Sequence, residues 1–102
     1  MDKPLFIPLQ TPYYLAFQNG DKTEELRRYG PGWNENTCYP GRAVTLSKGY
    51  GKQQRMAGII TSFRTCHATE LPTKAQADVL VVYGSLDLVI ACIGIKVTKP
   101  HG

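Results

Sequence analysis

The chain has 102 residues, a mass of 11.3 kDa and a formal net charge of +4 at pH 7. Hydrophobic residues make up 42% of it and charged residues 20%, which excludes a disordered or fibrous protein. A chain of this length can bury one modest core and has no room for two. We therefore expect a single domain over residues 1–102.

Neither a signal peptide nor a membrane span is expected. The first ten residues contain two prolines among a few apolar residues, unlike the continuous apolar stretch of a signal peptide. The longest apolar run, residues 88–95, is far too short to cross a bilayer. These features predict a cytoplasmic protein with no membrane partner, and they leave the oligomeric state open.

The cysteines indicate neither a disulfide framework nor a metal site. Cys38, Cys66 and Cys92 are odd in number, widely spaced and without a C-x-x-C pair. Cys66 and His67 are adjacent, but no second pair with ligand spacing accompanies them. The sequence therefore predicts reduced thiols, no metal and no cofactor.

The first half of the chain predicts a strand, a helix and a second strand, over residues 4–10, 11–20 and 22–29. For the helix, Thr11 is a suitable N-cap, Pro12 fits the first helical position and Gly20 can end it. In the second strand, alternation puts Glu25 and Arg27 on one side, and neither side is purely apolar. This pattern is typical of an edge strand or of a functional site.

The second half predicts an irregular segment, a hairpin, a helix and a last strand. Turn residues fill 30–41, and β-rich runs at 43–47 and 56–63 flank a glycine-bearing loop. Thr73 and Gln76 form a capping box that begins a helix ending before Gly84. Residues 86–97 are apolar on both faces, as in a central strand. The element order predicts an α+β fold, with a mixed, strongly curved sheet or small β-barrel and two helices.

The basic residues are unevenly distributed. Between Glu35 and Glu70 there is no acidic residue. The same interval carries five cations: Arg42, Lys48, Lys52, Arg55 and Arg64. Such a field favours an anionic partner such as phosphate, and the alternative is a solvated basic face.

The loop of the predicted hairpin mixes an aromatic ring with cations. Ser47, Lys48, Tyr50 and Lys52 offer the combination that single-stranded nucleic acids use, in which bases stack on rings and phosphates meet lysines. The alternative is an ordinary hairpin turn. Trp33 adds a further ring, although a lone tryptophan near a turn is typical of a lid on the core.

Lys22, Glu25 and Arg27 form a second candidate site. Glu25 and Arg27 share a face of the strand, whereas Lys22 joins them only if a turn or bulge re-aims it. A carboxylate beside two cations leaves cationic capacity for a phosphate or a polarised carbonyl. The carboxylate can also accept from the exocyclic amine of a base. The alternative is a surface salt-bridge cluster on an edge strand.

Gly20, Lys22, Glu25 and Arg27 stand as G-x-K-x-x-E-x-R, which resembles the signature of the activating signal cointegrator homology (ASCH) family. A strand and a short helix precede the motif, as in that family, and residues 39–51 look like its later segment entering the barrel. The resemblance covers about Leu5 to Val97. It implies a PUA-like β-barrel with a cleft that binds RNA or a modified nucleoside.

The resemblance also implies two kinds of activity. Some relatives are ribonucleases, and a small bacterial branch resembles amidohydrolases of N4-acetylcytidine, with a lysine and a threonine in the motif. This chain keeps Lys22 but has Glu25 at the position of that threonine, and Thr23 is out of register. If the protein is an enzyme, we expect Lys22 as the base, with Glu25 or Glu70 as proton partner.

The interpretation that we favour from the sequence is an ASCH-type domain that binds RNA or a nucleotide-like ligand. Its binding residues would be Gly20, Lys22, Glu25, Arg27, Ser47, Lys48, Tyr50 and Lys52. Lys22 and Arg27 would hold a phosphate or carbonyl oxygen, and Glu25 would read a donor. Hydrolysis of RNA or of an acylated nucleoside is the second hypothesis, and a non-catalytic protein-interaction module is the third.

Overall fold

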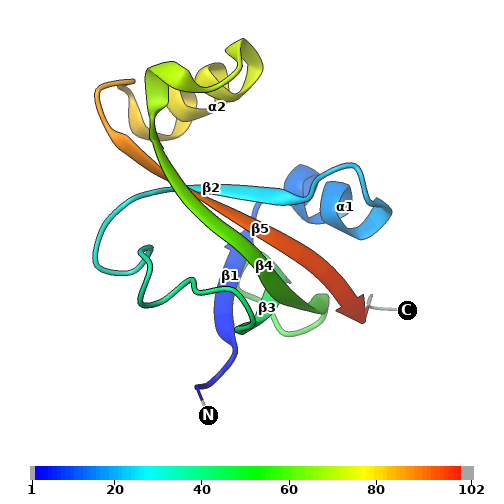
Figure 1. Cartoon of the computed structure of the whole chain (residues 1–102). Helices are drawn as coiled ribbons and strands as arrows, with labels where there is room; N and C mark the ends of the chain where they lie inside the picture. The colour runs from blue at the N-terminus through cyan, green and yellow to red at the C-terminus, as the bar shows by residue number, and fades with distance from the viewer. Residues whose placement is uncertain (1, 100–102) are drawn as a thin grey trace.

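The structure is a computed structural model that describes residues 2–99. Two α-helices, one short 3-10 helix and a five-stranded sheet make up this part of the chain (Figure 1). In chain order they are β1 (Leu5–Leu9), α1 (Thr11–Asn19), β2 (Glu24–Arg28), β3 (Ala43–Lys48), β4 (Arg55–His67), η1 (Ala68–Glu70), α2 (Thr73–Tyr83) and β5 (Val89–Lys99).

The sheet is mixed and curled into a half-barrel. Its strand order is β1-β3-β4-β5-β2, with β1 parallel to β3 and every other pair antiparallel. The predicted α+β class with two helices is confirmed, and β2 is an edge strand. The other edge strand is β1, so the half-barrel stays open between β1 and β2. The candidate site described below lies at this opening.

Both helices end where glycine was expected. Gly20 and Gly84 adopt left-handed conformations, with φ of 87° and 73°, and their amides donate to the last turn of α1 and α2. A residue with a Cβ is disfavoured at such a φ, so these glycines fix where each helix stops. The turn after Gly20 then carries the chain directly into Lys22 and β2.

The predicted helix starts are wrong in detail. Gln10, rather than Thr11, is the N-cap of α1, and Pro72, rather than Thr73, is the N-cap of α2. Neither cap makes a side-chain hydrogen bond to its helix. Gln76 donates instead to the carbonyls of Thr69 and Leu71, outside the helix. The capping box in this region belongs to η1, where His67 and Glu70 cap each other.

β4 is longer than its predicted range of 56–63 because its second half pairs with β5 as far as His67 opposite Val89. The register between these strands shifts between Ile60 and Ser62, which marks a bulge. Opposite this bulge a Cβ on Gly94 would lie 2.2 Å from the Ser62 hydroxyl oxygen, so a larger residue there would force the Ser62 side chain to move. The bulge increases the local twist that curls the sheet.

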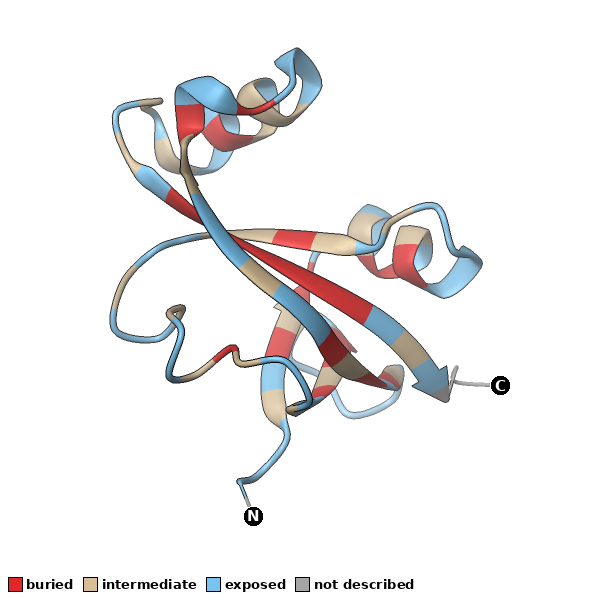
Figure 2. Cartoon of the chain, in the orientation of Figure 1, coloured by how far each residue is buried: buried red, intermediate tan, exposed pale blue. Residues whose placement is uncertain are grey.

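Two apolar clusters stabilise the two ends of the sheet. Tyr14 and Phe17 of α1 pack with side chains of every strand except β2, and Val79 of α2 packs with Ile90, Cys92 and Leu26 at the other end. Figure 2 shows the buried residues of both helices facing the sheet. The two helices therefore flank β2 from opposite ends (Figure 1). Within residues 2–99, neither helix has the length and apolar character that a membrane span requires.

The three cysteines are free thiols, as expected. Cys66 and Cys92 lie on neighbouring strands with their sulfur atoms 3.9 Å apart. Burial, and then the neighbouring Cys66, raise the pKa of Cys92 to about 12. The Cys92 thiol therefore stays protonated at physiological pH and behaves as a small apolar side chain.

Candidate functional site

A cleft of about 160 Å³ lies at the opening between the two edge strands, with α1 and α2 on either side. β1 contributes Pro8 and Leu9, and β2 contributes Glu25, Leu26 and Arg27. Gln10, Tyr13 and Lys22 complete one wall, and Asp78, Val79, Val82 and Tyr83 of α2 form the other. This volume is below that of pockets for drug-sized ligands, so it suits one ring-sized group.

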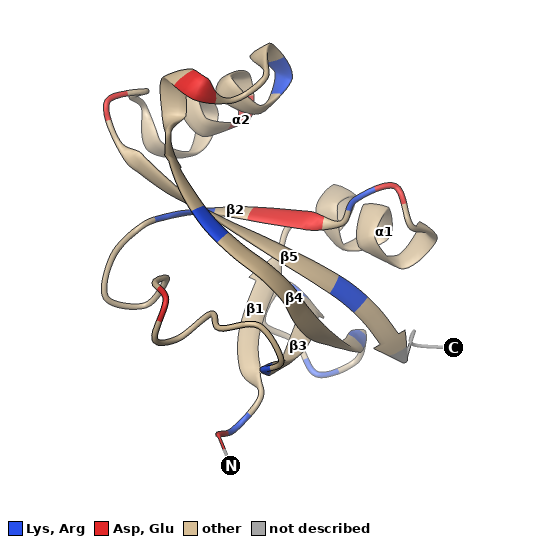
Figure 3. Ribbon diagram, viewed as in Figure 1, with Lys and Arg blue, Asp and Glu red and all other residues tan. Residues whose placement is uncertain are grey.

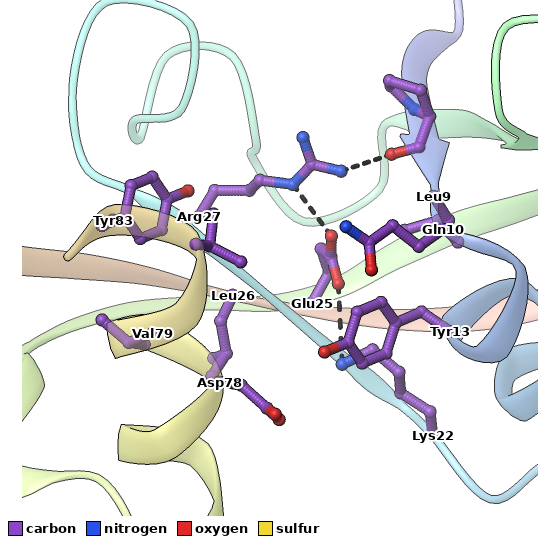
Figure 4. A pocket seen from close by; sticks show the side chains of 12 residues that line it. Leu9, Gln10, Tyr13, Lys22, Glu25, Leu26, Arg27, Asp78, Val79 and Tyr83 are labelled. Atoms are coloured by element: carbon purple, nitrogen blue, oxygen red, sulfur yellow. Dashed lines mark hydrogen bonds and ion pairs between the residues drawn. The ribbon is translucent and has the colours of Figure 1, made fainter.

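Lys22, Glu25 and Arg27 converge in this cleft (Figure 4). The Glu25 carboxylate accepts from Arg27 Nε at 2.8 Å through one oxygen and lies 3.5 Å from Lys22 Nζ through the other. Glu25 is only 7% exposed. The predicted convergence is confirmed, whereas the role of these residues in binding stays a prediction.

The turn after α1 brings Lys22 to the carboxylate. Lys22 precedes β2, and its amide donates to the Ala16 carbonyl at 3.1 Å, which fixes the turn. Its Nζ lies 5.2 Å from the ring centroid of Tyr13 and 5.6 Å from that of Phe17. These cation–π contacts, together with Glu25, hold the ammonium group in place before any ligand arrives.

Arg27 bridges the two edge strands. Its Nη2 donates to the Pro8 carbonyl of β1 at 2.6 Å, while Nε donates to Glu25 on β2. Its guanidinium stacks on Trp33, with 4.6 Å between the guanidinium carbon and the ring centroid. Trp33 is partly buried against the α1 cluster, in agreement with a lid on the core. Arg27 thus links the strands whose backbones leave the barrel open.

Tyr13 and Asp78 are cleft residues that the sequence reasoning missed. Burial first, and then the charges of Asp78 and Glu25 and a hydrogen bond to Asp78, raise the pKa of the Tyr13 hydroxyl above its ordinary value. The hydroxyl therefore stays protonated at neutral pH, with its proton directed at Asp78. Asp78 lies on α2, far along the chain from the motif, so no local sequence pattern predicts its place in the cleft. Figure 4 shows it on the α2 side of the cleft.

The charges of the cleft are balanced. Two cations, Lys22 and Arg27, and two carboxylates, Glu25 and Asp78, line it. The excess positive charge that a bound phosphate needs is therefore missing from the cleft. Donors and acceptors on fixed side chains suit instead a neutral polar ring that offers both kinds of group.

The other predicted binding residues lie outside the cleft. Ser47 is fully buried, and its hydroxyl donates to the Gly51 carbonyl at 3.1 Å, so its role is to shape the β3–β4 loop. Lys48 and Lys52 line a separate depression, which shares Leu9 and Gln10 with the cleft. Tyr50 is 82% exposed. Gly20 lines a third depression, which shares Lys22 with the cleft.

The basic interval divides into two kinds of residue. Arg42 donates to the carbonyls of Lys3 and Thr37, and Arg64 pairs with Glu24 at 3.1 Å. No ion pair within residues 2–99 involves the remaining cations, Lys48, Lys52 and Arg55. All three lie at the β3–β4 hairpin, where Figure 3 shows no acidic residue.

The residues that hydrolysis would need are poorly placed. Thr23 is exposed and lines the third depression instead of the cleft. Glu70 is outside the cleft, and its side chain accepts from the His67 amide as part of the η1 cap. Of the proton partners considered from the sequence, only Glu25 reaches Lys22.

Comparison with solved structures identifies the fold. The chain superposes on a point mutant of the ASCH protein from Zymomonas mobilis with a TM-score of 0.67 and 14% identity, over 97% of this chain and 73% of that one. A DUF984 protein from Enterococcus faecalis gives 0.68 and 12%, over 99% and 84%. A protein from Pyrococcus furiosus gives 0.60 and 16%, over 93% and 97%. No protein-family model and no curated protein matches the sequence.

The half-barrel with two flanking helices is thus an ASCH-type fold. The resemblance first drawn from the G-x-K-x-x-E-x-R motif is confirmed at the level of the fold. At identities of 12–16%, the similarity shows that the elements are arranged in the same way. It does not show which ligand is bound, because one fold can serve many functions.

Proposed function

We propose that this domain binds RNA, with a single nucleobase or nucleoside seated in the cleft. The observation that carries the proposal is the Lys22–Glu25–Arg27 cluster, which is ordered by its own contacts at the opening of the half-barrel. The ASCH resemblance implies RNA or a modified nucleoside as ligand, and the size and balanced charge of the cleft favour the heterocycle over the phosphate.

The side chains of the cleft offer complementary groups to a base. Glu25 accepts from an exocyclic amine, as carboxylates do with cytosine, and Lys22 donates to a ring carbonyl. Tyr13 supplies an aromatic wall, and its hydroxyl oxygen, whose proton is directed at Asp78, can accept from a donor of the base. Because these groups already hold one another, binding orders few side chains and the conformational entropy cost is small.

Phosphates would be held outside the cleft, at the β3–β4 hairpin. Lys48 and Lys52 are exposed there, and the depression that they line shares Leu9 and Gln10 with the cleft. A chain with one base in the cleft can therefore place neighbouring phosphates beside these lysines. Such contacts position an RNA without reading its sequence.

Binding of the four ribonucleosides, measured by calorimetry, tests the proposal. We expect one base type to be preferred, and we expect Glu25→Gln to reduce that preference by about tenfold, because the acceptor becomes a mixed donor and acceptor. Glu24→Gln is the matched control, since Glu24 is the neighbouring carboxylate and lines no part of the cleft. Equal affinity for all four nucleosides in wild type and variant would contradict the proposal.

Hydrolysis of an acylated nucleoside or of RNA is the second candidate, because Lys22 and Glu25 lie 3.5 Å apart inside the cleft. With Lys22 as base and Glu25 as proton partner, water would have to be the nucleophile, since no threonine within residues 2–99 lines the cleft. Turnover by the purified protein, with and without added metal ions, distinguishes this candidate from binding alone.

A further inference from the structure

We propose that Phe6, Tyr50 and Arg55 form a stacking platform for an unpaired base that flanks the nucleotide in the cleft, on single-stranded RNA. This inference rests on the proposed function of the cleft. The three residues come from β1, the β3–β4 loop and the start of β4, and none of them lines the cleft.

The platform consists of two neighbouring aromatic rings and a guanidinium group, and both rings are accessible to solvent. The Arg55 guanidinium carbon lies 5.2 Å from the ring centroid of Phe6. The ring centroids of Phe6 and Tyr50 are 6.2 Å apart, with their planes tilted by 40°. Tyr50 is 82% exposed and Phe6 36% exposed, so both rings present surface to solvent. Exposed aromatic rings beside a guanidinium are the groups on which unpaired bases stack.

The loop that carries Tyr50 is held in place by its own hydrogen bonds. The Gly51 carbonyl accepts from Ser47 Oγ at 3.1 Å and from Arg55 Nε at 3.3 Å. The Lys48 amide donates to the Gln54 carbonyl at 3.0 Å and closes the loop. The backbone that carries the ring is therefore already ordered, so a base that stacks on the ring costs little further backbone entropy.

A second contact ties the loop to the cleft. The amide of Gly49 donates to the Leu9 carbonyl at 2.9 Å, and Leu9 also lines the cleft. Tyr50 follows Gly49 directly. The platform therefore belongs to the hairpin that is anchored at the edge of the cleft, within reach of nucleotides that flank a base bound there.

The positive charge around the platform favours a polyanion as its ligand. Lys48 and Lys52 lie on either side of Tyr50 in the sequence, and β3, the loop and β4 contain no acidic residue. A single strand fits better than a duplex, because bases already stacked in a helix cannot lie against a tyrosine. Three cations and two exposed rings thus match the alternation of phosphate and base along one strand.

The platform is tested by fluorescence anisotropy with a labelled RNA hexamer rich in the base that the cleft prefers, alongside binding of the free nucleoside. We expect Tyr50→Ala to weaken hexamer binding about tenfold, since each stacked base contributes substantially to affinity. Nucleoside binding should be unchanged. Tyr50→Phe, which keeps the ring, should bind the hexamer within about twofold of wild type. At 82% exposure, neither substitution should disturb folding.

The outcomes separate this inference from the proposed function. Unchanged hexamer affinity in Tyr50→Ala would overturn the platform, while nucleoside binding that depends on Glu25 would still support the cleft. Hexamer binding that depends on Tyr50, with no binding of any nucleoside, would overturn the cleft and support stacking on Tyr50 without a nucleotide in the cleft. Failure of both ligands to bind would overturn both.

Discussion

The cleft and the β3–β4 hairpin use their cations in opposite ways. In the cleft, Lys22 and Arg27 are bound to Glu25, and Asp78 balances the second cation. At the hairpin, Lys48, Lys52 and Arg55 have no carboxylate partner within the part of the chain that the structure describes. Paired and ordered groups discriminate between neutral rings, whereas unpaired cations bind any polyanion. Under the proposed function, selectivity would therefore lie in the cleft and affinity for phosphate at the hairpin.

The largest effect is expected from removing Arg27. Arg27→Ala leaves the Glu25 carboxylate, 7% exposed, with Lys22 alone, and it breaks the bridge to Pro8 and the stack on Trp33. We expect a loss of about 2–3 kcal/mol in the free energy of unfolding, measured by urea denaturation. Arg64→Ala breaks an exposed pair with Glu24 and should cost less than about 1 kcal/mol. Equal costs would mean that the cleft pairs are as solvated as the surface pair.

The salt dependence of RNA binding tests whether the hairpin cations contact phosphates. With three cations on phosphates, the logarithm of the affinity should fall by roughly 2 for a tenfold rise in salt. Lys48→Ala combined with Lys52→Ala should reduce that slope to about 0.7 and weaken all sequences alike. Fluorescence anisotropy of a labelled RNA at three salt concentrations measures this slope for wild type and variant. Lys74→Ala with Lys96→Ala is the matched control, and an equal loss there would show that only net charge matters.

A smaller effect is expected from the hydroxyl of Tyr13. Tyr13→Phe removes one neutral hydrogen-bonding hydroxyl from the cleft and should weaken nucleoside binding by about two- to tenfold. Because the pKa of Tyr13 is raised above its ordinary value, the hydroxyl stays protonated throughout the neutral and mildly alkaline range. Nucleoside affinity should therefore be flat between pH 7 and 9, by calorimetry. A decline in wild type that is absent in Tyr13→Phe would contradict this account.

Turnover of N4-acetylcytidine should be weak or absent. By the ASCH resemblance, Glu25 stands where the amidohydrolase-like branch has a threonine, and Thr23 lies outside the cleft. Chromatography of the nucleoside after incubation with the protein measures the product. Product formation that disappears in Lys22→Ala would instead give Lys22 and Glu25 catalytic roles.

Local signals predicted the elements better than they predicted the site. Gly20 and Gly84 marked the helix ends because a left-handed residue is a local requirement. The two-residue spacing of Glu25 and Arg27 likewise fixed a shared face. The capping box at Thr73 was wrong because Pro72 already serves as N-cap, and Gln76 bonds to carbonyls outside the helix.

The rest of the site depends on contacts between distant segments. Asp78 reaches the cleft only because the long strands β4 and β5 place α2 beside β2, and the bulge opposite Gly94 that curls them has no clear local signature. Phe6 meets Tyr50 through the parallel pairing of β1 with β3. The sequence predicts Ser47 as an accessible binding residue, whereas its hydroxyl donates to the backbone of the β3–β4 loop.

The most direct test of the division between the two regions is a titration followed by ¹⁵N-resolved amide shifts. A free nucleoside should move the amides of Tyr13 and of residues 22–27, and it should leave those of residues 48–54 in place. An RNA hexamer should move both groups. Nucleoside-induced shifts confined to the hairpin, or a hexamer that moves no amide of the cleft, would contradict the assignment of base recognition to Lys22, Glu25 and Arg27.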